Sequence, residues 1–215
     1  GLVGAGQTLP VLECIGSSVR DRLAPMPWIE GPVLRDLIRS PDPDLSAIRH
    51  TARALSELHS QQVELGARDF DREVAGLHET AELLGYLLPE QVERVRELAG
   101  RLASRLAALP QDNAVVHGDF YAKQVVLSHD RVYLLDLDTI ARGDPLMDLG
   151  LFLAHLERDV VLREMESESA QAIGEAFCER YQRETAHPLA GLSVHIAAGL
   201  LRIAGYPFRT RNPVW

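Results

Sequence analysis

The stretch VVHGDFYAKQVVL, residues 115–127, decides the fold of this chain. A short β-branched apolar run leads into His117, Gly118 and Asp119, and a second such run begins after Gln124. Short β-branched runs separated by turn residues are typical of strands. We therefore predict two short strands that flank a loop. Positions where a strand ends and a loop opens often carry functional side chains.

The same pattern continues on the C-terminal side of this loop. Residues 131–138, RVYLLDLD, predict another short strand, and Asp136 lies near its end. Residues 142–145, RGDP, predict a turn. The middle of the chain is therefore expected to form a small β-hairpin region.

Apolar residues recur at helical spacing in most of the remaining sequence. Asp44 in PDPD is a plausible N-cap for the first long helix. A strand is possible at 11–15, VLECI, ahead of these helices. The fold class predicted is α+β and mainly α-helical. The expected helices cover 45–59, 71–84, 89–109 and 145–156, followed by two or three more within 160–204.

Composition limits the possible partners and locations of the protein. The chain has 215 residues, a formal net charge of −9 and scattered basic residues, so nucleic acid is a poor partner, because binding phosphates requires clustered cations. No apolar run approaches the length of a membrane span, and the start has no charged segment typical of a signal peptide. We expect a cytoplasmic protein. The first residue is not Met, which suggests that the chain continues a longer one.

Two carboxylates in the β-like region are hard to explain by structure alone. Asp119 and Asp136 both interrupt strongly apolar sequence where a loop opens, and buried carboxylates are costly unless they are paired or bind a metal. No His or Cys spacing suits zinc, and GSS at 16–18 lacks the serine nucleophile motif. GLVGAG at 1–6 has no GK[ST] after it. An oxygen-ligand site for Mg²⁺ remains.

Other polar residues of this region have structural interpretations beside functional ones. His117 could be a hydrogen-bonded core histidine, and Asp144 a turn residue. Asp148 could be a buried side chain that caps nearby backbone N–H groups. Lys123, the only lysine of the chain, could be a solvated loop charge or could contact a phosphate or an anionic acceptor. The acidic stretch 157–179 could be a solvated helix face or could line a site for a cationic acceptor.

At these residues the sequence resembles the aminoglycoside phosphotransferase and choline kinase family, which has the protein-kinase-like fold. That family carries H-G-D-x-x-x-x-N, then an I-D-x motif, then G-D-P-x-x-D-L-A. This chain has HGDFYAKQ at 117–124, LLDLD at 134–138 and GDPLMDLG at 143–150. PWIEGPVLRDLI at 27–38 resembles the hinge between the two lobes of the family, and ALSELHS at 54–60 the end of its next long helix. The resemblance covers roughly residues 25–205.

The resemblance implies a set of roles. Asp119 would accept or orient the proton of the acceptor hydroxyl, and His117 would organise the loop. Asp136 and Gln124 would bind Mg²⁺ beside the nucleotide phosphates. Asp148 would tie the loop backbone to the helix below it. Phosphoryl transfer depends mainly on such positioning and on charge neutralisation.

The hinge would bind the nucleotide, ATP or GTP, as the co-substrate. Its residues Trp28, Ile29, Glu30 and Gly31 are the expected nucleotide-binding residues, with backbone groups of 29–31 facing the base. Residues 1–31 are expected to be the remnant of a small lobe and the hinge. Residues 32–215 would form the helical large lobe, which carries the catalytic and metal-binding loops.

Two features depart from the family pattern. Gln124 stands where the family has Asn, although maltokinase-like branches also have Gln; a glutamine keeps the carbonyl oxygen on a longer stem. No lysine precedes the hinge in this chain, whereas the family has its nucleotide lysine there.

The predicted function is phosphoryl transfer to a hydroxyl of an aminoglycoside, amino alcohol or sugar. The alternative is a kinase-like binding module without catalysis.

Overall fold

The strands around the opening stretch form two small antiparallel sheets in a computed structural model, which describes residues 12, 14–110, 112–129 and 131–211. β1 (Ala114–Val116) pairs with β4 (Ala141–Gly143), with Val115 opposite Arg142. β2 (Val125–Ser128) pairs with β3 (Arg131–Leu134), with Val126 opposite Tyr133. The predicted hairpin region is confirmed, but the strand expected over 131–138 ends at Leu134. Asp136 stops it, because this residue adopts the left-handed backbone conformation.

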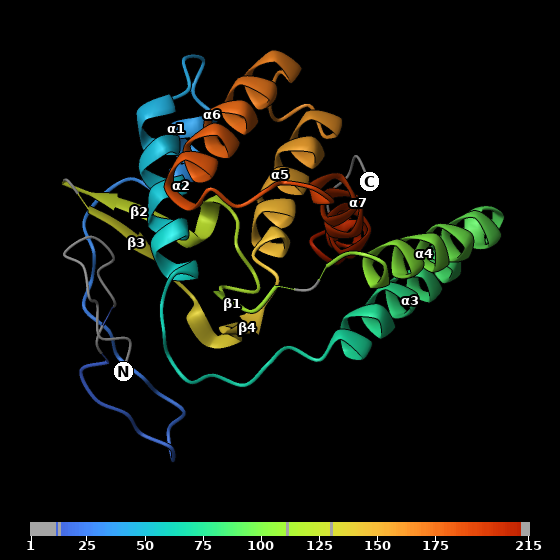
Figure 1. The fold of residues 1–215 in the computed structure, drawn as a ribbon, viewed down its shortest axis with the longest axis horizontal. Helices are drawn as coiled ribbons and strands as arrows, with labels where there is room; N and C mark the ends of the chain where they lie inside the picture. Colours follow the sequence, from blue (N-terminus) through green and yellow to red (C-terminus); the bar gives the residue numbers. More distant parts are fainter. Residues whose placement is uncertain (1–11, 13, 111, 130, 212–215) are drawn as a thin grey trace.

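Helices make up most of the remaining structure (Figure 1). The side chain of Asp44 caps the second helix as predicted, because its Oδ1 accepts hydrogen bonds from the N–H groups of Ser46 and Ala47. The mainly helical fold class is confirmed. The helices are α1 (Leu34–Ile38), α2 (Leu45–His59), α3 (Phe70–Leu87), α4 (Val92–Ala107), α5 (Leu146–Val161), α6 (Ser167–Thr185), α7 (Leu192–Ile203) and α8 (Tyr206–Arg209), and the 3-10 turns are η1 (Pro89–Gln91), η2 (Ala122–Gln124) and η3 (Leu137–Thr139).

The main core lies between α2, α5, α6 and the strands. Phe120, which directly follows Asp119, is fully buried and its ring lies near those of Phe152 on α5 and Phe177 on α6. Figure 1 shows α2, α6 and α5 next to one another, with the β2–β3 pair beside α2 and the β1–β4 pair below α5 in this view. The 117–124 loop is therefore held by an aromatic side chain inserted into the core, while Asp119, Lys123 and Gln124 remain near the surface.

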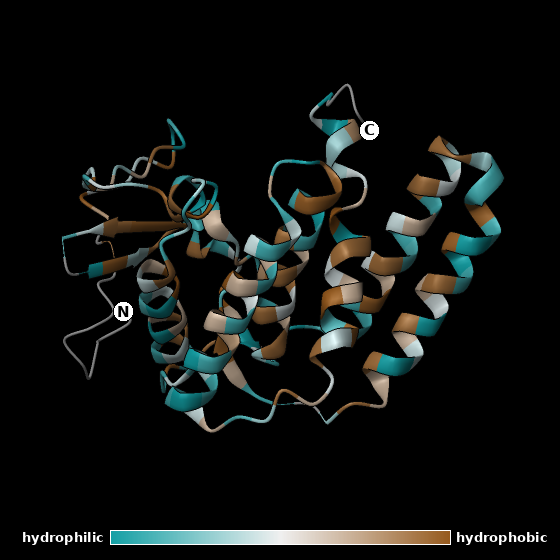
Figure 2. Cartoon of the chain, turned by 90° about the horizontal axis from the view of Figure 1, so that it is seen from above, coloured by the Kyte–Doolittle hydropathy of each residue, from teal (hydrophilic) through white to brown (hydrophobic). Residues whose placement is uncertain are grey.

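A second, smaller apolar cluster lies where α3, α4 and α7 meet. These two helices form an arm that extends away from the main core and touches the rest of the molecule along α7 (Figure 1). Hydrophilic and hydrophobic residues alternate along both helices (Figure 2), as expected for helices that bury one face only. The buried members of this cluster are Leu77, Ala81, Leu84, Ala99, Leu102, Leu106 and Leu201.

The segment before α1 runs beside β2. Leu127 N–H donates to the Pro32 carbonyl at 3.0 Å, and Val33 forms a β-bridge with Val126. Gly31 has a φ of +152° and lies against the Leu127 carbonyl so closely that a Cβ atom would overlap it. The strand expected at 11–15 is not seen at residues 12, 14 and 15, and residues 11 and 13 lie outside the described part.

The length and hydropathy of the helices bear on membrane insertion. Within the part of the chain that the structure describes, no helix is both long enough and apolar enough to span a bilayer.

Candidate active site

Asp148, in the first turn of α5, holds the backbone of the 117–124 loop. Its Oδ2 accepts the N–H of His117 at 2.6 Å, and its Oδ1 accepts the N–H of Gly118 at 2.8 Å. The side chain is buried, and Nε2 of His59, the last residue of α2, lies 3.0 Å from Oδ2. The other ring nitrogen of His59 lies 2.7 Å from the Tyr181 hydroxyl on α6. Three helices therefore fix one carboxylate, and that carboxylate fixes the loop.

This environment keeps Asp148 ionised. Burial alone would raise the pKa of its carboxyl, but the hydrogen bond with His59, the electrostatic influence of the His59 and His117 rings and the hydrogen bond from the Gly118 N–H outweigh burial and hold the pKa below its ordinary value. An ionised carboxylate accepts hydrogen bonds through both oxygens. Asp148 can therefore accept hydrogen bonds from both backbone N–H groups at once, whereas a protonated carboxyl group would be a weaker acceptor.

His117 connects the loop with the chain just before Asp136. Its ring is fully buried, and Nε2 lies 2.8 Å from the Leu135 carbonyl oxygen. Because a carbonyl oxygen only accepts, we assign the proton of the neutral ring to Nε2. Nδ1 is then an acceptor and receives the Asp119 N–H at 3.4 Å. One imidazole thus sets the spacing between the segments that carry the two candidate carboxylates.

Gly118 is the tight point of the loop. Its φ is +85°, and a Cβ atom here would lie 2.7 Å from the Thr139 carbonyl oxygen. Its own carbonyl accepts a hydrogen bond from Nη1 of Arg202 at 3.2 Å. A residue with a side chain would be strained by this conformation and would push the loop away from η3.

Asp119 points its carboxylate toward solvent at the edge of this frame. The side chain is 41% exposed, and its Oδ1 lies 3.6 Å from Nη2 of Arg202 on α7. A carboxylate that is open on one side and positioned through its backbone on the other is accessible to a small molecule.

Gln124 and Asp136 lie side by side. The side-chain Nε2 of Gln124 donates to Asp136 Oδ2 at 3.0 Å, and the backbone carbonyl of Gln124 accepts the Leu135 N–H at 2.8 Å. Asp136 has φ 61° and ψ 56°, a conformation that costs a residue with a side chain about 1–2 kcal/mol. Non-glycine residues held in this region cluster at functional sites.

The chemistry of this pair fits Mg²⁺. Among the described residues, no group of three or more His, Cys, Asp or Glu side chains is arranged to hold a metal ion. Mg²⁺ usually takes one or two protein oxygens and completes its shell with water and phosphates. Asp136 offers a carboxylate, and a half-turn of the Gln124 amide would bring its carbonyl oxygen into the place of the nitrogen. Both donors stand at the rim of the loop rather than in the core.

The expected nucleotide-binding residues precede Pro32 and Val33, which contact β2. Trp28 is 89% exposed, and Ile29 is half-buried. Gly31 is packed against the backbone of β2. The backbone of this segment is therefore held by the sheet that ends next to Gln124, whereas the large side chain of Trp28 is left uncovered by the described residues.

Several residues of the site have no role in the sequence analysis. Arg202 contacts both Gly118 and Asp119, and its only signal is a charge in the otherwise apolar run LLRIA. His59 belongs to the quoted motif ALSELHS, but the motif does not show that it reaches Asp148. Tyr181 has no sequence signal; burial, followed by the charge of Asp148, raises its pKa far above the ordinary value.

Comparison with known proteins agrees with this geometry. Residues 4–189 match the phosphotransferase enzyme family, and the chain belongs to that family, as its resemblance to aminoglycoside phosphotransferases and choline kinases implied. No curated protein matches the chain in sequence.

The fold of this chain is similar to that of several solved structures, some of which are named as small-molecule kinases or phosphotransferases. A choline/ethanolamine kinase family protein from Mesorhizobium loti has a TM-score of 0.66 and 19% identity, covering 95% of this chain and 68% of its own. Aminoglycoside phosphotransferase APH(3'')-Id from Streptomyces rimosus ATCC10970, in complex with ADP and streptomycin, has a TM-score of 0.57 and 24% identity, covering 82% and 69%.

A glucosamine kinase in complex with glucosamine, ADP and inorganic phosphate has a TM-score of 0.58 and 20% identity, covering 77% of this chain and 49% of its own. The chain thus spans about half the length of that kinase. At these identities the likeness shows the fold, which is that of protein-kinase-like phosphotransferases.

Proposed function

We propose that this chain carries the large lobe of a small-molecule kinase that transfers the γ-phosphate of ATP or GTP to a hydroxyl group. The observation that supports this most strongly is the joint placement of Asp119 and of the Gln124–Asp136 pair by one hydrogen-bonded frame, centred on Asp148 and His117. Separate structural roles would not require two carboxylates at the surface ends of one rigid loop system.

In this proposal each residue acts through the contact it makes. The acceptor oxygen bonds to the γ-phosphorus while the bond from that phosphorus to the bridging oxygen breaks, so the nucleoside diphosphate leaves and the hydroxyl proton passes to Asp119. Asp119 also orients the hydroxyl. His117 and Asp148 keep the loop in place, and Arg202 sits beside the Asp119 carboxylate. General-base or orienting contributions of this kind are worth about 10²–10⁴ in rate.

Asp136 and Gln124 would hold Mg²⁺, which supplies charge neutralisation for the phosphate oxygens when bound. Trp28, Ile29, Glu30 and Gly31 would form the hinge that meets the base, with residues 1–31 belonging to the small-lobe side and 32–215 to the large lobe. The acceptor in this proposal is a small molecule. Glucosamine and streptomycin, the ligands named with two of the solved structures, support amino sugars and aminoglycosides as candidates.

The test is a transfer assay on the full-length protein. Aminoglycosides, sugars and amino alcohols are screened with γ-labelled ATP and GTP, and the parent is compared with Asp119→Asn. We expect transfer by the parent, a loss of about 10²–10⁴ in kcat in the variant, and nearly equal nucleotide affinity by calorimetry. Equal rates in parent and variant would remove Asp119 from its role.

The alternative is a kinase-like binding module, and one observation favours it. The only lysine of the chain is Lys123, in the loop itself, so the residues before the hinge offer no lysine to the phosphates. Nucleotide binding without transfer to any acceptor class would support the module and contradict the kinase.

A further inference from the structure

A narrow pocket lies beside the 117–124 loop, between that loop, α1 and α5. Its volume is about 20 Å³, room for a single water molecule, so a larger ligand would occupy its mouth. The lining contains four cationic side chains and one carboxylate. The cations are Arg35 from α1, Arg39 directly after that helix, Lys123 from the loop and Arg158 from α5, and the carboxylate is Asp159. This concentration of positive charge stands out in a chain with a net charge of −9.

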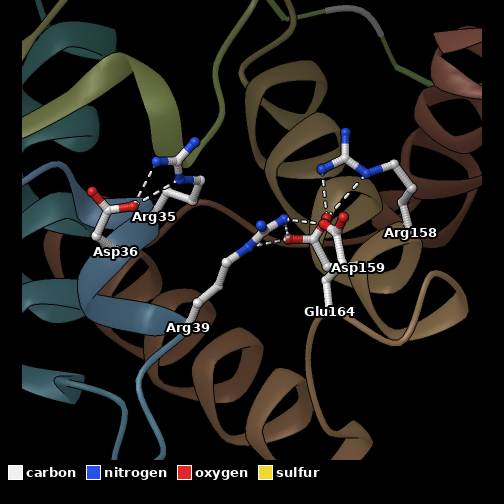
Figure 3. A network of polar contacts seen from close by, with 6 residues as sticks. All are labelled: Arg35, Asp36, Arg39, Arg158, Asp159 and Glu164. Carbon is white, nitrogen blue, oxygen red and sulfur yellow. Dashed lines mark hydrogen bonds and ion pairs between the residues drawn. The ribbon is translucent and has the colours of Figure 1, made fainter. Parts of the chain in front are cut away.

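The arginines of this lining are held in place by carboxylates (Figure 3). The buried carboxylate of Asp159 forms ion pairs with Nη2 of Arg39 and with Nη2 of Arg158, and each N–O distance is 2.5 Å. Arg39 also pairs with Glu164, and Arg35 pairs with Asp36. A guanidinium has five N–H donors, so one or two carboxylate contacts leave donors for a further anion. The network therefore presents oriented donors rather than mobile charges.

Lys123 differs from these arginines. In the described part of the chain no ion pair joins its ammonium to a carboxylate, and the side chain is exposed at the pocket. The residue after it, Gln124, contacts Asp136, and Asp119 lies four residues before it in the same loop. A ligand held by Lys123 is thereby held by the segment that also carries the proposed proton acceptor.

The inner wall of the pocket provides an unpartnered polar atom. His155 stacks on Tyr121 with ring centroids 4.5 Å apart, and its Nδ1 is buried without a hydrogen-bond partner among the described residues. Burial, followed by the charge of Arg158, lowers the pKa of His155 to about 3, although Asp159 opposes this; Lys123 and Arg202 add to the lowering. The ring is therefore neutral, and an unsatisfied buried nitrogen favours a ligand that can bond to it.

We propose that this pocket is an acceptor subsite that binds an oxyanion, a carboxylate or phosphate, on the molecule to be phosphorylated, with Lys123 as its principal contact. The inference rests on the proposed function and names the substrate class within it. It favours sugar acids, sugar phosphates and hydroxy acids over amino alcohols. Of the acidic stretch 157–179, Asp159 and Glu164 are already paired with arginines, so they are not free to receive a cationic acceptor.

Matched acceptors test this on the full-length protein. Glucose, glucuronate and glucose 6-phosphate share a ring and differ at carbon 6, so they separate the neutral, carboxylate and phosphate cases. We expect kcat/KM for at least one anionic acceptor to exceed that for glucose by about tenfold or more. Lys123→Ala should lower this anionic-to-neutral ratio about tenfold, and Lys123→Arg should restore most of it. Arg101→Ala, which removes an exposed cation on α4, should leave the ratio unchanged.

A ratio that is the same in Lys123→Ala and in the parent would overturn the inference. Glucose transfer with no preference for either anion would overturn it too, while leaving the kinase proposal intact. If no transfer occurs at all, calorimetry with inorganic phosphate and with glucuronate decides separately: a dissociation constant about tenfold weaker in Lys123→Ala supports the subsite without the kinase. Equal binding in both proteins, or no binding at millimolar concentration, contradicts it.

Discussion

Asp136 shows how one backbone conformation can create a site. Its left-handed φ and ψ end β3, turn the chain into η3 and bring the carboxylate against Gln124. Glycine would adopt this conformation more easily, so the side chain rather than the backbone explains the choice of residue. Substitutions of the neighbouring Gln124 therefore test whether the two side chains bind a metal ion or only form a hydrogen bond with each other.

Gln124→Asn and Gln124→Leu distinguish these two roles. If Gln124 is a magnesium ligand, the Asn variant keeps measurable activity but requires more Mg²⁺ for half-maximal rate, because the carbonyl remains on a shorter stem. The Leu variant loses most activity, because it offers no oxygen. If the amide only bonds Asp136, both variants lose stability, by about 0.5–1.5 kcal/mol for a hydrogen bond between exposed groups, and the magnesium requirement stays fixed.

The readouts are initial rates against Mg²⁺ concentration and melting temperatures of all three proteins. A well-folded Leu variant with the magnesium requirement of the parent would rule out the ligand role.

His155 makes the stability depend on pH. Its pKa is lowered to about 3 by burial first and by Arg158 second, against an ordinary value of 6.5. Between these values the unfolded chain binds a proton that the folded chain does not, so this residue's contribution lowers the free energy of unfolding as the pH falls from about 6.5 toward 3. His155→Leu, of similar size and without a titrating group, should therefore lose less melting temperature between pH 7 and pH 4.5 than the parent does. Equal losses in parent and variant would contradict the buried neutral state.

At the scale of elements, two glycines bring α5 and α7 together. A Cβ atom on Gly150 would lie 2.6 Å from the Cβ of His195, and one on Gly199 would lie 2.9 Å from the Cβ of Ala154. This close approach places Arg202 of α7 against Gly118 and Asp119. Helix packing and site geometry are therefore linked through positions where only a hydrogen atom fits.

Gly150→Ala should force the two helices apart. We expect a loss of about 1–3 kcal/mol in the free energy of unfolding, the usual cost of overpacking, and a lower kcat because Arg202 moves away from the loop. Gly100→Ala is the matched control: no atom lies within 4 Å of its added Cβ, so α4 should gain up to ~1 kcal/mol from helix propensity. Urea unfolding measures both, and a destabilised Gly100→Ala or a neutral Gly150→Ala would contradict the packing argument.

Features that depend on contacts between neighbours in the sequence could be predicted, whereas features that depend on contacts between distant segments could not. The helices, the Asp44 cap and the strands around residues 117–124 depend on neighbours in sequence, so periodicity and turn residues indicate them. The contacts of Arg202 with the loop depend on how α7 packs on α5, which no local pattern encodes. Helix α3, expected over 71–84, extends to Phe70–Leu87 because its cap is Asp69 and its last turn packs in the arm.

At the scale of the whole molecule, the apolar interior is divided. The main core joins α2, α5, α6 and the strands, whereas the arm of α3 and α4 has its own cluster, which meets the rest through α7. The frame around Asp148 draws only on the main core, through α2, α5 and α6. The Asp148 frame therefore does not depend directly on the arm, whose link to the site runs through α7 and its Arg202. The arm could open while Asp148 still holds the loop.

Hydrogen exchange followed by mass spectrometry tests this division. Amide protons of α3 and α4 should exchange through an opening with a lower free energy than those of α2 and α5, because fewer buried apolar groups hold the arm. Leu102→Ala, which truncates a buried side chain of the arm cluster, should lower the protection of every helix by about 2–5 kcal/mol, because the arm is unfolded in both the partial and the global opening. Leu55→Ala, in the main core, should lower the protection of α2 and α5 and leave that of α3 and α4 unchanged, because Leu55 stays packed while the arm alone opens. If Leu55→Ala instead lowers the protection of the arm as much as that of α2 and α5, the molecule opens as one unit and the argument for an independent arm fails.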